Sequence, residues 1–223
     1  MKAVKLRQAQ VKRKTNETSI AVKLNLMARA GRQSRRAYPF SITCSRCSPS
    51  TRSWTCTLRC SGDLEVDAHH TVEDCGIALG QAFVQALGDK RGIRRYGTGF
   101  HPRNPLTAEA FVPMDECLAR CVIDFSGRPY LVWRGLDGFA YRKLGKSEKR
   151  QDASSAFRFG LAREFFKVSS TKRVAICIWN CFYGDEPHHI VEALFKAFAK
   201  AVDIACQRDP RIAGRLPSTK GKL

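Results

Sequence analysis

The chain has 223 residues, of which 43% are hydrophobic, and its formal net charge at pH 7 is +19. This length suits one large domain or two small ones, and the hydrophobic fraction is sufficient for an ordinary core. No run of about 18 apolar residues occurs, so no transmembrane helix is expected. The basic start of the chain lacks the apolar stretch of a signal peptide. We therefore expect a cytoplasmic protein, or an organellar one if a targeting segment is removed.

The positive charge is concentrated in two stretches. Residues 27–60 contain seven Arg, no Lys and no acid, and residues 134–173 contain eleven Lys or Arg against four acids. A basic protein of this size is a candidate for nucleic-acid binding. The charge lies outside the motifs described below, however, and is not interleaved with aromatic platforms that could stack on bases. A nucleic-acid-binding protein therefore remains the alternative prediction, and nucleic acid is disfavoured as a partner.

Four cysteines lie in the first basic stretch. Cys44 and Cys47 form a Cys-x-x-Cys pair, and Cys56 and Cys60 follow, a spacing similar to half of a zinc ribbon. Without a signal peptide, disulfides are disfavoured. The region also lacks the hydrophobic periodicity that a ribbon needs around its ligands, so zinc is disfavoured here.

Two later segments, residues 67–87 and 186–206, repeat each other at a constant offset of 119. Apolar residues of the second segment recur at helical spacing, which predicts that both are helices. The repeat carries a His-His-x-x-Glu motif in each copy: His69, His70 and Glu73 in the first, and His188, His189 and Glu192 in the second. Such duplication indicates a fold of two related halves.

The motif has the residue types and the spacing of a metal site. Each histidine lies three or four residues before the glutamate, so all three side chains share one face at the start of a helix. Neutral imidazole together with carboxylate suits manganese, iron or zinc. One such motif could equally be a polar helix start. Two copies at matched positions, in a chain with only five histidines, favour metal binding.

The chain resembles the imidazoleglycerol-phosphate dehydratase family in several blocks. "GDLEVDAHHTVEDCGIALGQA" and "HHIVEALFKAFAKA" are similar to two family signatures. Further similarity lies in "RKTNETSIAVKLNL", "ALGDKRGIRRYG", "PMDECLAR", "DFSGRPYLV" and "DPRIAGRLPSTKGKL". Together these blocks cover roughly two thirds of the chain and are jointly very specific.

The resemblance implies a hydro-lyase of histidine biosynthesis, which removes water from D-erythro-imidazoleglycerol phosphate to give imidazole-acetol phosphate. It implies two Mn²⁺ ions per site, sites built between subunits, and trimers that assemble into a 24-subunit shell. The implied fold class is α+β, a single domain over residues 1–223. Its half-repeats span about 11–100 and about 112–206, each a mixed or antiparallel sheet covered by helices on one face.

The resemblance also implies roles for individual residues. The acid–base candidates are Glu17, Glu73 and Glu192. The metal ligands are His69, His70, Glu73, His188, His189 and Glu192. The substrate contacts are Glu17, His69, His70, Glu73, Arg95, Arg128, His188, His189, Lys196, Ser218, Thr219 and Lys220. Arginine binds phosphate through two parallel hydrogen bonds, although each arginine could equally be an ordinary surface charge.

Two stretches depart from the family pattern in a way that the genetic code explains. Codons compatible with residues 27–60 can be regrouped to permit a family-like block that contains Leu-Asp-His-Met. Codons within about 168–182 can be regrouped to permit Asn-Leu-His-Leu-Glu-Leu. The family has Leu-His-Leu-Glu-Leu-Leu-Tyr-Gly here, and its last two residues match Tyr183 and Gly184, which follow in frame. We therefore hypothesise that both stretches are read in a shifted frame, which also explains their surplus Arg and Cys.

The shifts have consequences for the chain as written. The family takes further metal ligands from histidines near positions 43 and 178, where this chain has Thr43 and Ile178. We expect weaker manganese binding, poor activity and loss of core strands in both stretches, or in the extreme an inactive family member. Residues 101–111 interrupt a family block as an insertion, and His101 within them is not assigned to metal. Resequencing the coding DNA tests the frame-shift hypothesis.

Overall fold

The computed structural model describes residues 7–28, 53–97, 111–136, 138, 158–171, 175–212 and 214–223. The strands are β1 (Gln8–Lys14), β2 (Thr18–Ala28), β3 (Ser53–Gly62), β4 (Tyr96–Gly97), β5 (Phe111–Met114), β6 (Cys117–Asp124), β7 (Tyr130–Arg134) and β8 (Ile176–Tyr183). The helices are α1 (His69–Leu87), α2 (Gly160–Thr171) and α3 (Pro187–Cys206), followed by a 3-10 turn, η2 (Pro210–Ile212).

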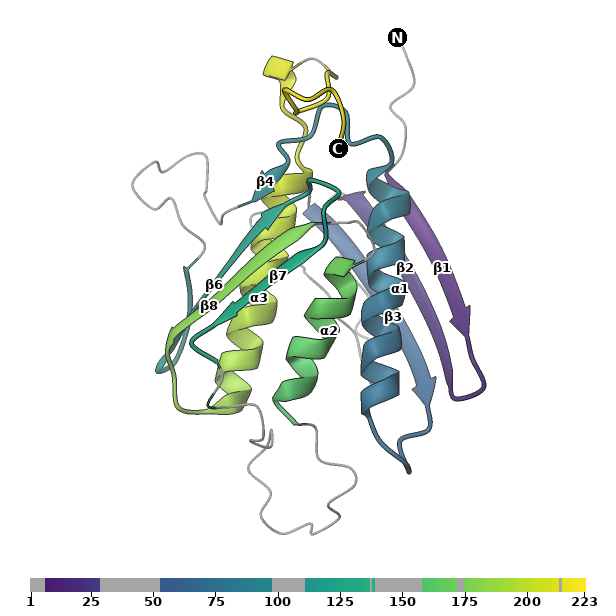
Figure 1. The fold of residues 1–223 in the computed structure, drawn as a ribbon, viewed down its shortest axis with the longest axis vertical. Coiled ribbons are helices and arrows are strands. Elements are labelled where there is room, and N and C mark those ends of the chain that lie inside the picture. The colour runs from purple at the N-terminus through teal and green to yellow at the C-terminus, as the bar shows by residue number, and fades with distance from the viewer. Residues whose placement is uncertain are drawn as a thin grey trace.

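The strands form two sheets, and the helices lie between them (Figure 1). One sheet has the order β1-β2-β3 and is antiparallel. The other has the order β4-β6-β8-β7, with β5 also paired to β6 and with β7 parallel to β8. Helix α1 covers the first sheet, whereas α3 and α2 contact the second. This confirms the expected α+β class, with each sheet covered by helices on one face.

The internal repeat is visible in the order of elements. A hairpin (β1-β2), a third antiparallel strand (β3) and a helix that begins with the motif (α1) recur as β5-β6, β8 and α3. Both helices begin at the same end of the molecule (Figure 1). The predicted helices 67–87 and 186–206 are thus confirmed within two residues at their starts.

Alternating burial produces the strands, and apolar stripes produce the helices. On β2, Ile20, Val22, Leu24 and Leu26 are buried while the residues between them are more exposed, as expected for side chains that point to opposite faces of a sheet. Buried residues of both sheets and all three helices form one contiguous core. In that core the indole Nε1–H of Trp54 on β3 donates to the carbonyl of Ala199 on α3 at 2.9 Å.

The expectation that the two shifted stretches lose their strands is wrong for residues 53–60 and 176–182. Strand β3 buries Trp54, Cys56 and Leu58, and β8 buries Trp179 between two cysteines. Both strands keep an alternating apolar face, and that pattern is what a half-buried strand requires. The fit is imperfect, because the buried Nε1–H of Trp179 has no hydrogen-bond partner among the described residues. Residues 29–52 lie outside the described part of the chain.

Helices α1 and α2 cross at very short range through two glycines of α1. A Cβ atom at Gly76 would lie 2.5 Å from the carbonyl oxygen of Phe165, and one at Gly80 would lie 2.7 Å from that of Ser169. Both obstacles are backbone atoms of α2, which cannot move aside as a flexible side chain could. The Gly-x-x-x-Gly spacing therefore sets the distance between the two helices.

Replacing Gly80 with Ala will lower the free energy of unfolding by about 1–3 kcal/mol, because the added methyl overpacks the crossing. In an unobstructed helix interior the same change would stabilise the protein by about 1 kcal/mol. The sign of the change in the free energy of unfolding therefore shows whether the two helices cross this closely. Urea denaturation measures it. Gln85→Ala, on the exposed side of the same helix, is the control and should change stability little. A more stable Gly80→Ala protein would contradict the close crossing.

Among the described residues, no helix combines the length and apolarity needed to span a membrane. The basic stretches lie largely outside the described part of the chain, as do Cys44, Cys47 and residues 101–110 of the proposed insertion. Phe111, at the end of that insertion, is the first residue of β5. Cys56 is a buried free thiol, and burial raises its pKa to about 12, so it is poorly suited to bind zinc as a thiolate.

Candidate active site

Both motifs lie at helix starts that are fixed in the same way. The side chain of Asp67 accepts a hydrogen bond from the backbone N–H of His69 at 2.6 Å, and Glu186 accepts one from His188 at 3.3 Å. Asp67 and Glu186 are themselves 119 residues apart, so the capping acid belongs to the repeat. A carboxylate before the first turn satisfies a free N–H and favours the positive end of the helix dipole. Each pair of histidines is thereby placed in the first turn.

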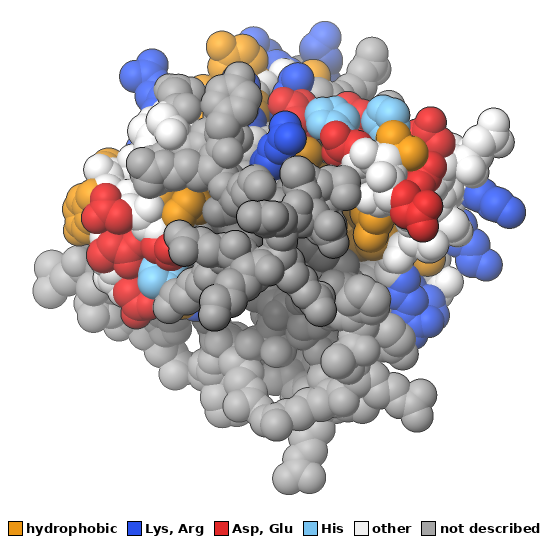
Figure 2. Space-filling view, turned by 90° about the horizontal axis from the view of Figure 1, so that it is seen from below, with side chains coloured by type: hydrophobic (Ala, Val, Ile, Leu, Met, Phe, Trp, Pro, Cys, Tyr) orange, Lys and Arg blue, Asp and Glu red, His pale blue; other side chains and the backbone are white. Residues whose placement is uncertain are grey.

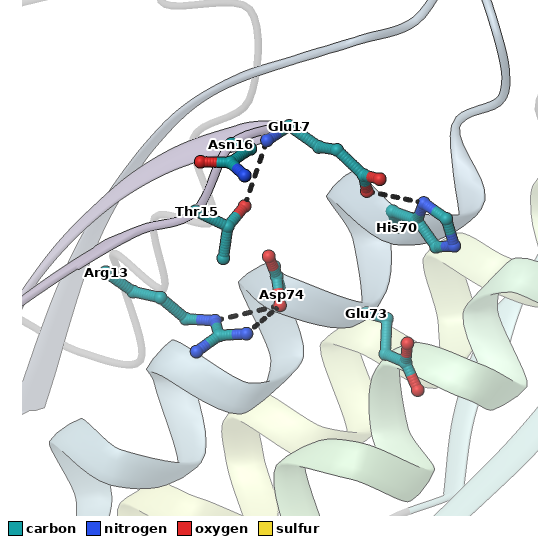
Figure 3. Close-up of a pocket in the computed structure, with 7 residues that line it drawn as sticks. All are labelled: Arg13, Thr15, Asn16, Glu17, His70, Glu73 and Asp74. Atoms are coloured by element: carbon teal, nitrogen blue, oxygen red, sulfur yellow. Dashed lines mark hydrogen bonds and ion pairs between the residues drawn. The ribbon is translucent and has the colours of Figure 1, made fainter.

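The first motif opens onto a cavity beneath the β1-β2 turn (Figure 3). The cavity has a volume of about 330 Å³ and is lined by Arg13, Thr15, Asn16, Glu17, His70, Glu73 and Asp74. Oε2 of Glu17 lies 2.7 Å from Nδ1 of His70, so the turn and the helix meet at these two side chains. Glu17 and His70, two of the residues that the resemblance singled out, therefore meet at this cavity, and Glu73 also lines it.

Asp74 holds this arrangement in place and was missed by sequence reasoning. Its carboxylate accepts from Nε of Arg13 on β1 at 2.8 Å and from the hydroxyl of Thr18 on β2. Asp74 is 8% exposed, and a carboxylate this deep requires such partners. It ties the hairpin to α1 and so sets the position of Glu17 relative to His70. The sequence signal that could have identified Asp74 is its position directly after Glu73, the glutamate of the motif.

The second motif meets the β5-β6 turn in a corresponding way. Nδ1 of His189 lies 2.8 Å from Oε2 of Glu116, and Nε2 lies 3.4 Å from Oδ2 of Asp115. One helical turn further on, Glu192 lies 3.5 Å from Nε2 of His188. Lys196 forms an ion pair with Glu192 at 2.8 Å. The sequence placed the histidines and Glu192 here, but it did not assign Asp115 or Glu116.

Hydrogen bonds keep the carboxylates at and beside the second motif ionised. Hydrogen bonds from the backbone N–H of Glu186 and from His189 lower the pKa of Glu116 to about 2. The hydrogen bond from Lys196 lowers the pKa of Glu192. The hydrogen bond to Glu116 raises the pKa of His189. Hydrogen bonding to the charged form favours that form over the neutral one and explains each of these shifts.

The expected phosphate contacts lie elsewhere. Arg95 donates to both carboxylate oxygens of Asp124, at 2.7 and 3.2 Å, and to the carbonyl of Pro217 at 2.8 Å. It thereby holds the C-terminal segment, in which the backbone N–H of Lys220 donates to the Ser218 hydroxyl. Arg128, Thr219 and Lys220 are exposed nearby on the loops at this end. Much of the hydrogen-bonding capacity of Arg95 is thus already used within the chain.

The two groups of candidates occupy opposite ends of the molecule. In Figure 1 the starts of α1 and α3 lie at the bottom, whereas β4 and the C-terminus lie at the top. Helix α1 has 19 residues, which at about 1.5 Å per residue separates the ends by roughly 28 Å. The motif histidines and the C-terminal residues of one chain therefore cannot bind one small substrate together.

Figure 2, which views the end that carries both motifs, shows histidine side chains beside acidic ones in two separate groups. Imidazole and carboxylate are the donors that manganese accepts, and within each group two such donors lie close enough for one cation to reach both, for example His188 and Glu192 at 3.5 Å. No set of three or more His, Cys, Asp or Glu side chains converges on a metal position within the described ranges. The residues fit manganese in kind, and each group offers only some of the donors that a coordination shell would need.

The fold and these clusters define a duplicated α+β protein that presents the same histidine–carboxylate arrangement twice. A sequence model of imidazoleglycerol-phosphate dehydratase matches residues 49–202. Proteins of that name from Cereibacter sphaeroides and Paracoccus denitrificans are 44% and 43% identical, over 98% of this chain and 100% of theirs. The chain belongs to the imidazoleglycerol-phosphate dehydratase family. It is a hydro-lyase of histidine biosynthesis by that membership, which supports the enzyme over the nucleic-acid-binding alternative.

Solved structures agree on the fold. The imidazoleglycerol-phosphate dehydratase of Staphylococcus aureus matches with a TM-score of 0.56 over 90% of this chain and 99% of that one, at 24% identity. The corresponding enzyme of Pyrococcus furiosus matches with a TM-score of 0.60 over 96% of this chain and 100% of that one, also at 24% identity.

Proposed function

We propose that this chain removes water from D-erythro-imidazoleglycerol phosphate to give imidazole-acetol phosphate, with Mn²⁺ as cofactor at two ions per site. The observation that carries the proposal is the contact between Glu17 and His70 at the mouth of a cavity that Glu73 also lines. It supports the proposal because a carboxylate that could move a proton lies beside a residue of the expected metal set. Acid–base catalysis requires a titratable group within such hydrogen-bond reach.

Different residues would bind the metal ions, transfer protons and contact the substrate. His69, His70 and Glu73, together with His188, His189 and Glu192, would hold the metal ions. Bound Mn²⁺ would act as a Lewis acid that withdraws electrons from the substrate imidazole and orients it. Glu17 would take the weakly acidic proton from the carbon next to the ring, and Glu73 and Glu192 complete the acid–base set. Lys196, one turn beyond Glu192, would contact substrate.

Phosphate binding would come from the group at the other end of the chain. Arg95, Arg128, Ser218, Thr219 and Lys220 supply cations and hydroxyl or backbone donors of the kind that recognise phosphate. Since this end lies roughly 28 Å from the motifs, a complete site combines the motif end of one chain with the C-terminal end of another. A homo-oligomer, such as a 24-mer of trimers, satisfies this requirement. We place the protein in the cytoplasm.

The test is a dehydratase assay on the purified full chain after chelation and dialysis. We expect no turnover without metal and turnover restored by added Mn²⁺, with Mg²⁺ as the control for a nonspecific divalent ion. Binding of Mn²⁺ is followed separately by the loss of the free-ion electron paramagnetic resonance signal. Metal-independent turnover would refute the cofactor, and absence of both turnover and Mn²⁺ binding, in this chain and in its frame-corrected form, would refute the proposed function.

A further inference from the structure

The carboxylate of Glu116 joins three parts of the second half. Its Oε1 accepts hydrogen bonds from the backbone N–H groups of Asp185 at 3.2 Å and Glu186 at 2.8 Å. Its Oε2 lies 2.8 Å from Nδ1 of His189. One side chain from the β5-β6 turn thus binds both the loop that leads into α3 and the second histidine of the motif. We propose that Glu116 is a positioning residue that fixes the tautomer and orientation of His189 for cation binding through Nε2.

The distances decide where the single proton of the neutral ring resides. At 2.8 Å the contact between Nδ1 and Glu116 is a good hydrogen bond, whereas the 3.4 Å between Nε2 and Asp115 exceeds the usual range. The proton therefore lies on Nδ1, and Nε2 keeps its lone pair. A histidine that donates one ring N–H to a carboxylate has its other nitrogen oriented and made more basic as a ligand. Glu116 is the carboxylate that accepts from Nδ1 of His189.

The first half shows why Glu116 differs from its counterpart. Glu17, also on a hairpin turn, contacts Nδ1 of the second motif histidine, His70, at 2.7 Å. The carboxylate–histidine contact therefore belongs to the repeated unit. The Glu17 side chain is 55% exposed and, within the described part of the chain, it contacts His70 alone, whereas Glu116 is also held by two backbone donors. A carboxylate held by three donors is suited to fix a ring, and a carboxylate with one contact is suited to move a proton.

Glu116→Gln separates the two functions of the carboxylate. The amide oxygen can still accept from the two backbone N–H groups, so its NH₂ group faces His189. Because NH₂ only donates, Nδ1 must then become the acceptor, and the ring proton moves to Nε2. The lone pair on Nε2 is thereby lost. We expect Mn²⁺ affinity to fall by about 10- to 100-fold at the site that His189 serves, while the metal-free protein remains folded.

The experiment combines a metal-free and a metal-bound measurement. In alkaline buffer, where the ring is neutral, ¹H–¹⁵N spectra of the metal-free chain should show His189 as the Nδ1–H tautomer, and Glu116→Gln should convert it to Nε2–H. Titration with Mn²⁺ alone, followed by electron paramagnetic resonance, should show the loss of affinity. Glu164→Gln is the matched control, since it removes a carboxylate that pairs with Lys167 on α2 and should change neither measurement.

The outcomes are distinguishable from those that test the proposed function, on which the cation role rests. An Nε2–H tautomer in the unsubstituted chain would overturn the proposal whatever the substitution does. Equal Mn²⁺ affinity in the unsubstituted and Glu116→Gln chains would also overturn it. In a chain that already carries His189→Asn, adding Glu116→Gln should weaken Mn²⁺ binding no further; an additional loss would mean that Glu116 acts independently of His189. If the unsubstituted chain binds no Mn²⁺, the proposed cofactor fails and the inference with it, even where the tautomer is as expected.

Discussion

A chain in which residues 27–60 and about 168–182 are restored to the shifted reading frame will dehydrate imidazoleglycerol phosphate faster than the chain as written, by about 10²-fold or more. The reason is the ligand set. Removing a residue that merely supports a metal ligand already lowers affinity or activity by about 10- to 100-fold. The regrouped codons restore histidines that the resemblance assigns as metal ligands themselves, so the effect should be larger. Steady-state turnover in excess Mn²⁺ measures the difference.

The structure adds a second reason at β8. Trp179 is fully buried in the core, and its Nε1–H has no hydrogen-bond partner among the described residues. An unsatisfied buried donor costs about 1–3 kcal/mol. The regrouped frame replaces it with leucine, which has no polar group to satisfy. The restored chain should therefore also be the more stable of the two in urea denaturation.

Two partial restorations serve as controls for this prediction. Restoring only 168–182 should recover the stability at β8 but leave the histidine near position 43 absent. Restoring only 27–60 should supply that histidine but leave Trp179 unsatisfied in β8. Equal activity of the chain as written and the restored chain would show that the extra histidines are not needed. Coding DNA that agrees with the printed sequence in both stretches would remove the reason to restore them.

Much of the fold could be predicted because the signal is local and repeated. The constant offset between His69 and His188 places two equivalent helices, and the duplication implies two related sheets. The strand at β8 could not be predicted by family comparison, because residues 174–182 lack the family pattern. It forms nevertheless, since Cys177, Trp179 and Cys181 preserve the alternation of apolar side chains that a buried strand face needs.

The candidate site was predictable in its histidines but not in its supporting carboxylates. Glu116 lies 73 residues before His189, and the pairing of β6 with β8 and the packing of α3 against β5 and β6 bring the two together. Asp74 carries no distinctive spacing, and its role depends on Arg13 and Thr18 in a different element. The resemblance implies sites between subunits, but it does not say that the motif residues and the C-terminal residues lie at opposite ends of one chain.

Because the motif end and the C-terminal end of one chain are far apart, we predict that activity recovers when two inactive variants assemble together. In the more active of the two chains, Glu73→Gln disables the motif end and Lys220→Ala disables the C-terminal end. Lys220 is chosen over Arg95 because its side chain is exposed, whereas Arg95 holds Asp124 and Pro217. Each variant alone should lose most of its turnover, since each leaves every site without an acid–base or a phosphate-binding group.

Coexpression of the two variants should restore about a quarter of the unsubstituted activity. If each site combines the motif end of one chain with the C-terminal end of another, a random assembly gives half of the sites an intact motif end, and half of those an intact C-terminal end. Lys220→Ala mixed with Ser218→Ala is the control, because both changes affect the same end and no site can be intact. Turnover in the mixture that merely averages the two variants would mean that one chain builds its whole site. That outcome would require the two ends to approach across roughly 28 Å of helix, which the packed core between the sheets does not permit.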